Sequence, residues 1–260
     1  MTETISFAEV PYLEELRNYL PIDATDKEDV STYLKNVTDS ILVNYGNEQY
    51  QFAYFGVHLL YMTYIYFSVR KISILIPERY QDAVVFAKPY HGRKLDFNNL
   101  ESAFDYSLVA EKDLPNILKI IGLDDNQIGK IGGLVDNRNE MAHAKGRFMI
   151  LNEEAFIASV NGIYNSVRNI HNRMDLQIRR WYKDFLLQYC NKKFEEYNDE
   201  FDDIIEEQMI QGFNLSIQEL LVCNEMSIKP LTSEKPEFIN ELNRFKKALR
   251  KYCEAQGYIE

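Results

Sequence analysis

The polar and apolar positions of this chain follow helical periods over most of its length. Apolar side chains recur at intervals of three and four residues from Val30 to Tyr45, the pattern of a helix that buries one face. Thr25-Asp-Lys-Glu28 has the form of a capping box, so we expect this helix to begin there and to end near Gly46. A helix with one apolar face needs a partner, and the next segment of the chain can supply it.

The segment from Tyr50 to Val69 contains twenty residues without a formal charge and continues past two basic residues to Ile76. It is long enough to cross a bilayer. However, polar residues such as Gln51 are spread along it, and its five tyrosines are distributed over its whole length instead of forming two interfacial belts. We therefore expect no membrane span but the central helix of a bundle, or one that also packs on a second subunit. We interpret His58 as a core residue with a satisfied ring nitrogen.

Further helices are expected between Pro77 and Arg173. Residues 78–94 should be irregular or partly helical. The first helix predicted beyond them runs from Asp96 to about Val109, and the second begins at Asp113 and ends before Gly122. The third follows Asp124 and Asp125 and carries the polar cluster described below, and the fourth runs from about Asn152 to Arg173. Gly129, Gly132 and Gly133 would weaken the third of these by roughly 1 kcal/mol each relative to Ala, which suggests close backbone contact with another element.

From Met174 to Ile205 a helical period continues over a length typical of a projecting arm or a helical hairpin. Basic side chains come first in this segment and acidic ones follow, so the basic part with Trp181 could hold RNA, or both parts could be solvated faces. A last helix, from about Pro236 to Gln256, carries basic residues that could neutralise the acidic part. We therefore expect an all-α protein with a helical bundle in residues 1–173 and a C-terminal helical extension in residues 174–260.

The composition narrows the possible functions of this 260-residue chain. Its formal net charge of −11 argues against a generic nucleic-acid binder, so any contact with RNA must be local. The three cysteines, Cys190, Cys223 and Cys253, lack metal-ligand spacing and are typical of reduced thiols in a cytoplasmic protein. We expect no metal, no cofactor and no signal peptide.

The candidate chemistry lies in a polar cluster from Leu134 to Arg147. Arg138 offers a planar donor fork suited to a phosphate, and His143 can exchange protons near neutral pH. Asn139 and His143 are four residues apart and share a helix face, whereas Arg138 is five residues from His143 and must lean in or rely on a distorted helix. We expect Arg138 and His143 in an open cleft. Three basic residues complete this neighbourhood as candidate RNA contacts: Lys130, Lys145 and Arg147.

The sequence Arg138-Asn-Glu-Met-Ala-His143 resembles the R-N-x-x-x-H signature of HEPN (higher eukaryotes and prokaryotes nucleotide-binding) domains, and the resemblance covers about residues 49–173. It implies an all-helical, metal-independent endoribonuclease that attacks RNA through its own 2′-OH and leaves a 2′,3′-cyclic phosphate. His143 would be the general acid or base, Arg138 would bind the phosphate and stabilise its developing charge, and Asn139 would position the phosphate or hold His143.

The resemblance also implies a homodimer in which two motifs share one cleft, and a role as a toxin with its antitoxin, or in antiviral defence, under a regulatory protein. Two alternatives remain open. The motif could be an exposed helix end with a core histidine, and the chain could be a non-catalytic helical module that binds protein through its acidic surface.

Overall fold

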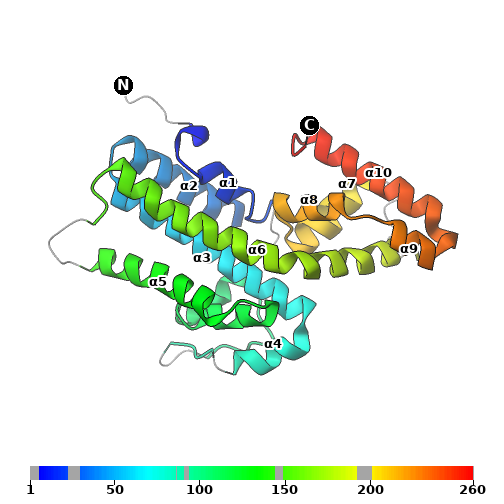
Figure 1. Ribbon diagram of the computed structural model, residues 1–260, viewed down its shortest axis with the longest axis horizontal. Helices are drawn as coiled ribbons and strands as arrows, with labels where there is room; N and C mark the ends of the chain where they lie inside the picture. The colour runs from blue at the N-terminus through cyan, green and yellow to red at the C-terminus, as the bar shows by residue number, and fades with distance from the viewer. Residues whose placement is uncertain are drawn as a thin grey trace. The chain divides into compact units, whose positions relative to one another are not determined.

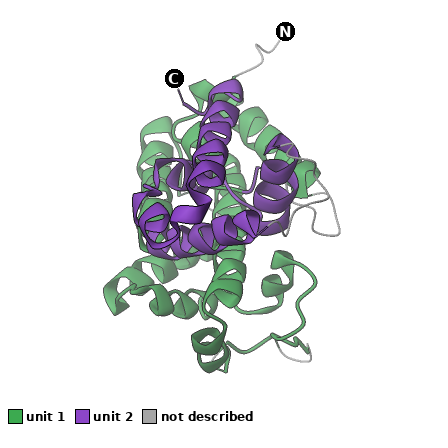
Figure 2. Cartoon of the chain, turned by 90° about the vertical axis from the view of Figure 1, so that its right-hand side faces the viewer, with its two compact units in different colours: residues 1–20, 26–173 green, residues 21–25, 174–260 purple. Residues whose placement is uncertain are grey.

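The computed structural model describes residues 6–22, 30–85, 87–90, 94–143, 149–191 and 201–259. These residues form helices and no strand, apart from two isolated β-bridges, so the predicted all-α class is confirmed. Two compact units divide the chain: residues 1–20 with 26–173, and residues 21–25 with 174–260 (Figure 2). Helix α6 (Glu153–Cys190) contributes residues to both.

Helix α3 (Tyr50–Leu75) is the centre of the first unit and packs against α2 (Val30–Gly46). The two helices cross closely, because a Cβ atom on Gly56 would lie 2.5 Å from Cγ1 of Ile41. Helix α3 is long and apolar enough to cross a membrane, but 83% of its most apolar window is buried inside the protein. That burial supports the prediction of a central bundle helix. The predicted start of α2 at Thr25 lies outside the described residues.

The first part of α6 lies along α3, and Figure 1 shows α2, α3 and α6 side by side. Two buried tyrosines of α3 anchor the contact: Tyr61 shares a hydrogen bond of 2.9 Å with Ser166, and the hydroxyl of Tyr64 donates to the carbonyl of Val167 at 3.3 Å. The amino-terminal helix α1 (Leu13–Arg17) also belongs to this unit.

The segment after α3 is more helical at its start, and less regular further on, than expected. It contains α4 (Pro77–Val84), η2 (Ala103–Leu108) and η3 (Leu114–Ile121). The helix expected from Asp96 is wrong. A short 3-10 helix begins instead after Ser102, whose side chain accepts a hydrogen bond from the backbone of Phe104. The helix predicted up to Gly122 is present as the 3-10 helix η3, and Gly122 closes it with a left-handed φ of 91°.

Helix α5 (Asp125–Ala142) carries the motif and begins where the sequence predicted. Asp124 and Gln127 form a reciprocal capping box, with hydrogen bonds of 2.8 and 2.9 Å. The amide of Gln127 also donates to Asn169 of α6 at 3.1 Å, and Leu134 lies beside Gly162 of the same helix. Residue numbers therefore rise along α5 as they fall along α6, so the two helices are antiparallel.

The surroundings of the glycines of α5 differ from the prediction. A Cβ atom added to Gly129, Gly132 or Gly133 would meet nothing within 4 Å among the described residues. The prediction of close backbone contact is therefore wrong for the described part of the chain, where no atom covers the glycine face of α5, which carries these three residues.

The second unit is built around the later part of α6. It contains α7 (Phe201–Asp203), the π-helical η5 (Ile204–Gln211), α8 (Ile217–Glu225), α9 (Lys229–Glu234), η6 (Pro236–Phe238) and α10 (Ile239–Ala255). Its three cysteines are free and buried. Trp181 stacks on Phe213 at 4.1 Å with an interplanar angle of 9°, so this ring is used in packing.

Two basic residues of the long helix α6 pair with carboxylates. Arg179 binds Asp175 at 2.7 Å, and Lys183 binds Glu234 at 2.9 Å. These pairs favour the interpretation of the basic run as a solvated face. Helix α10 packs on α7, but residues 192–200 of the acidic segment lie outside the described range, and its expected neutralisation by α10 stays a prediction.

Candidate active site

Arg138 lies on α5 with its side chain 26% exposed, and its Nη2 donates to Oε2 of Glu111. Glu111 comes from the turn between η2 and η3 and is 23% exposed. The Nε2 atom of His58, on α3, lies 3.6 Å from the same carboxylate oxygen. Three separate elements therefore bring these side chains together. We call Arg138, Glu111 and His58 the Arg138 cluster.

The charge states of the Arg138 cluster follow from burial and from its neighbours. Burial raises the pKa of Glu111, but His58 and Arg138 outweigh this effect and hold the pKa below its ordinary value. Burial lowers the pKa of His58, which Glu111 only partly offsets. Burial also raises the pKa of nearby Tyr54 to about 12, against the opposing charge of Arg138. The cluster near neutral pH is thus one ion pair beside a neutral imidazole.

The structure corrects two predictions at this place. His58 is buried as expected, with its side chain 1% exposed, but neither ring nitrogen has a hydrogen-bond partner among the described residues. Arg138 was expected in an open cleft, whereas it is partly buried and already bound to a carboxylate; its Nε is also buried without a partner in this part of the chain. The Nε–H of Arg138 is therefore a donor that no described residue uses, and it is buried.

His143 ends α5 and is exposed, and its backbone N–H donates to the carbonyl of Asn139 at 3.2 Å. Its φ of −78° is close to helical, so its Cβ stays on the side of Asn139, while its ψ of 138° is extended and ends the helix. Asn139 is half-buried. The side chain of Arg138 points instead toward Glu111. Among the described residues no side-chain hydrogen bond joins Arg138 to His143.

Gln51 holds the end of α5 in place, and the sequence analysis assigned it no such role. Its Oε1 accepts hydrogen bonds from the backbone N–H groups of Met149 at 2.7 Å and Ile150 at 3.5 Å, and its Nε2 lies 3.4 Å from the carbonyl oxygen of Met141. This buried amide therefore joins the first turn of α3 to the residues on both sides of positions 144–148. It is a clasp for the segment that carries His143.

A weak signal for two of these residues exists in the sequence. Gln51 and His58 are polar, lie in an otherwise apolar helix and are seven residues apart, so they share one face. That face is the one turned to the motif. Glu111 gives no comparable signal, because it comes from an irregular segment without a period.

The three candidate RNA contacts are only partly described. Lys130 is exposed on α5 and lies about 12 Å along the helix axis from Arg138, at 1.5 Å per residue. Lys145 and Arg147 lie outside the described residues. The expected basic neighbourhood thus remains a prediction.

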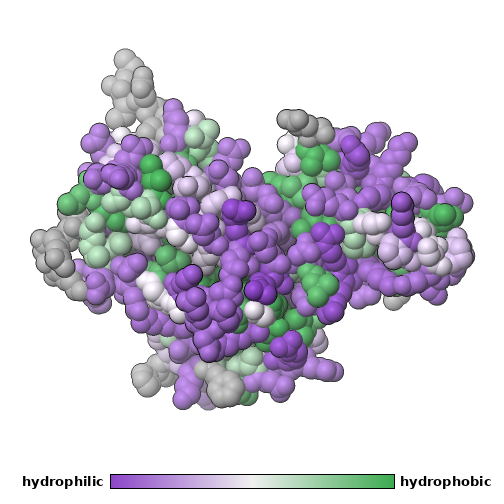
Figure 3. All heavy atoms as spheres, in the orientation of Figure 1, coloured by the Kyte–Doolittle hydropathy of each residue, from purple (hydrophilic) through white to green (hydrophobic). Residues whose placement is uncertain are grey.

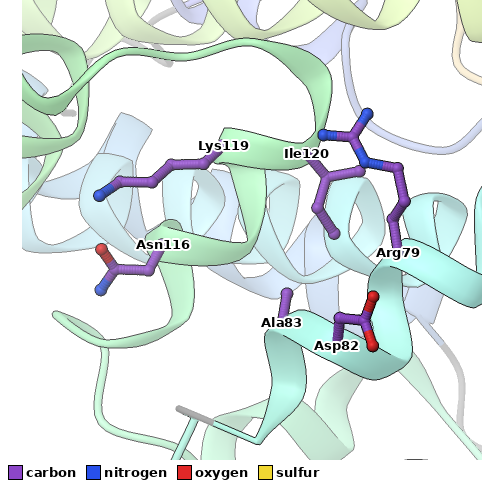
Figure 4. Close-up of a pocket in the computed structure, with 6 residues that line it drawn as sticks. All are labelled: Arg79, Asp82, Ala83, Asn116, Lys119 and Ile120. Carbon is purple, nitrogen blue, oxygen red and sulfur yellow. The ribbon is translucent and has the colours of Figure 1, made fainter.

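A hollow of about 500 Å³ lies elsewhere in this unit, between α4 and η3 (Figure 4). Arg79 and Lys119 are its cations, but their charged ends lie at opposite sides of it, and Lys119 pairs with Asp125 at 2.6 Å. It does not hold the convergent charges of a phosphate site. Among the described residues no group of three or more His, Cys, Asp or Glu side chains is placed to hold a metal.

Comparison of the chain with protein-family models, with curated proteins and with solved structures finds no match. The assignment of the candidate site therefore rests on the residues of this chain alone.

Proposed function

We propose that this protein is an endoribonuclease that cleaves RNA by attack of the 2′-OH, with no metal required. The observation that carries the proposal is the end of α5. There a partly buried guanidinium, Arg138, already holds an oxyanion, and an exposed imidazole, His143, follows five residues later. An arginine in a partly desolvated place binds phosphate more strongly than one in water.

In the proposed reaction the 2′ oxygen attacks the neighbouring phosphorus and the bond to the 5′ oxygen breaks. His143 removes the proton from the 2′-OH or returns one to the leaving 5′ oxygen. Arg138 stabilises the charge that develops on the phosphate, and Asn139 positions it. The products are a 2′,3′-cyclic phosphate and a 5′-OH.

The second proton transfer is proposed to come from His143 of a second copy in a homodimer. Helix α3, which was expected to be central in the bundle or to pack also on a second subunit, is mostly buried within this chain. Two of its residues, Phe52 and Leu59, are nevertheless 45% and 46% exposed, and the glycine face of α5 is open. A two-fold axis beside these surfaces would double the basic residues around the motif and offset the net charge of −11.

We propose that the cleavage serves growth arrest or antiviral defence in the cytoplasm, as a toxin or effector held in check by an antitoxin or another regulatory protein. Free activity of this kind harms its own cell, so control by a partner is part of the proposal.

Incubation of the purified protein with total RNA tests the assignment. The wild-type protein should degrade RNA and His143→Ala should not, with the melting temperature unchanged because His143 is exposed. Asn137→Ala is the matched control, since Asn137 is exposed on the same helix next to the motif and has no assigned role.

A second candidate function is a non-catalytic module that binds protein. Two observations favour it: Glu111 neutralises Arg138, and the net charge of −11 suits the binding of a basic partner. The face of the molecule in Figure 3 is mostly hydrophilic, so such binding would be polar. Intact RNA with wild-type protein, over a range of salt concentrations and protein concentrations, would favour this module over the nuclease.

A further inference from the structure

The carboxylate of Glu111 occupies the donor of Arg138 that a phosphate would use. A carboxylate and a phosphodiester carry the same charge and offer similar oxygen acceptors to a guanidinium. Nη2 carries two N–H groups, but a phosphate that binds it meets the negative charge of Glu111, and two anions at one site repel each other. Binding of RNA at Arg138 is therefore weakened as long as Glu111 stays in place.

A second position for this carboxylate is present beside it. His58 Nε2 lies 3.6 Å from Glu111 Oε2, and His58 is buried with no hydrogen-bond partner among the described residues. A movement of roughly 0.8 Å would bring the carboxylate to hydrogen-bond distance from a protonated Nε2. The other ionisable groups around His58 are Arg138, from α5, and the tyrosines Tyr54 and Tyr61 of its own helix.

The turn that carries Glu111 need not move as a whole. The next residue, Lys112, forms its own ion pair with Asp136 of α5, and both side chains are about half exposed, at 51% and 53%. Backbone hydrogen bonds from Asp113 and Leu114 to the carbonyl of Ala110, at 2.9 and 3.2 Å, close the turn. Movement of the Glu111 side chain alone would therefore be enough to bring its carboxylate closer to His58.

We propose that Glu111 and His58 are positioning residues of the phosphate site. Glu111 takes the place of the RNA phosphate on Arg138 in the free protein, and His58 receives the carboxylate when RNA binds. This inference rests on the proposed function, because the phosphate in question is that of RNA. It adds an internal competitor that sets the affinity of the site.

The test is the affinity for a fluorescent single-stranded 2′-O-methyl oligoribonucleotide, which lacks the free 2′-OH and cannot be cleaved by the proposed reaction. Glu111→Gln keeps the size of the side chain and removes its charge, so it should bind at least about threefold more tightly than wild type. Asp136→Asn is the matched control, since it removes the same charge from the neighbouring ion pair. Its affinity should stay within about twofold of wild type.

His58 is tested in the same assay by a double-mutant cycle. His58→Leu should weaken binding about threefold while Glu111 is present, because the carboxylate then has no second partner. It should change nothing in the Glu111→Gln background. A general packing defect from leucine would weaken binding in both backgrounds. If Glu111→Gln does not fold, Glu111→Asp, which shortens the side chain by one methylene, should still bind more tightly than wild type.

Several results would overturn the inference. These are an unchanged or weaker affinity of both Glu111 variants, an equal gain for Asp136→Asn, or no binding of the oligonucleotide by any of the proteins. A protein that binds more tightly on Glu111→Gln but never cleaves RNA would retain the inference and reject the nuclease. The two failures are thus distinguishable.

Discussion

Replacement of Gln51 by methionine should release the end of α5 without unfolding the bundle. The side chains have similar length and helix propensity, so α3 keeps its packing. The substitution removes the acceptor of the 2.7 Å bond from Met149, the longer 3.5 Å bond from Ile150 and the 3.4 Å contact with Met141. At about 1 kcal/mol for the short bond and less for each long one, the local cost is about 1 to 2 kcal/mol.

Hydrogen exchange measures that cost directly. Each 1.4 kcal/mol of local opening corresponds to about tenfold faster exchange, so the amide of Met149 should exchange about five to thirty times faster. The same change at Gln177 on α6 is the control and should leave this amide unaffected. RNA cleavage should fall with the loss of the clasp, because His143 lies in the segment that it holds. Unchanged exchange at Met149 in a folded Gln51→Met protein would refute the role of the clasp.

Three further predictions concern packing, charge and assembly. Gly133→Ala should raise the free energy of unfolding by about 0.5 to 1 kcal/mol, because its Cβ meets nothing within 4 Å among the described residues. Gly56→Ala should lower the free energy of unfolding, because its Cβ would lie 2.5 Å from Ile41. Urea unfolding of both variants measures these changes. Burial holds the pKa of His58 below 6.5, so as the pH falls the imidazole of the unfolded chain binds a proton before that of the folded protein. The free energy of unfolding should therefore fall between about pH 7 and pH 5 in the wild-type protein, and fall less in His58→Gln. Inactive Arg138→Ala and His143→Ala subunits should regain cleavage when mixed, if two motifs share one cleft; a mixture as inactive as its components would contradict the shared cleft.

The helices with a clear period could be predicted from the sequence. Helix α2 from Val30 to Gly46 and helix α3 lie where apolar spacing placed them, and the amino-terminal end of α5 lies where the sequence predicted it. The short 3-10 helix η2 could not be predicted, because its few residues, capped by Ser102 and Asp105, are too short to show an apolar period. The open glycines of α5 were misread because a weak helix former shows only that a position tolerates glycine, not what lies beside it.

The sequence names the candidate residues of the site but not their surroundings. The motif itself identifies Arg138, Asn139 and His143. The partner of Arg138 is set by tertiary packing that joins α5, α3 and the turn at Glu111, and no local pattern reports such a contact. The expected burial of His58 is confirmed, but its expected satisfied ring nitrogen is wrong for the same reason.

The chemistry of the RNA ends tests the central claim most directly. RNA treated with wild-type protein in excess EDTA should acquire new 2′,3′-cyclic phosphate and 5′-OH ends, detected by mass spectrometry of the fragments, because the proposed reaction uses His143 and Arg138 and no metal. Asn137→Ala should give the same ends, and His143→Ala should give none. Intact RNA with the wild-type protein, ends that form equally with His143→Ala, or cleavage that appears only when Mg²⁺ or Mn²⁺ is added would contradict the account.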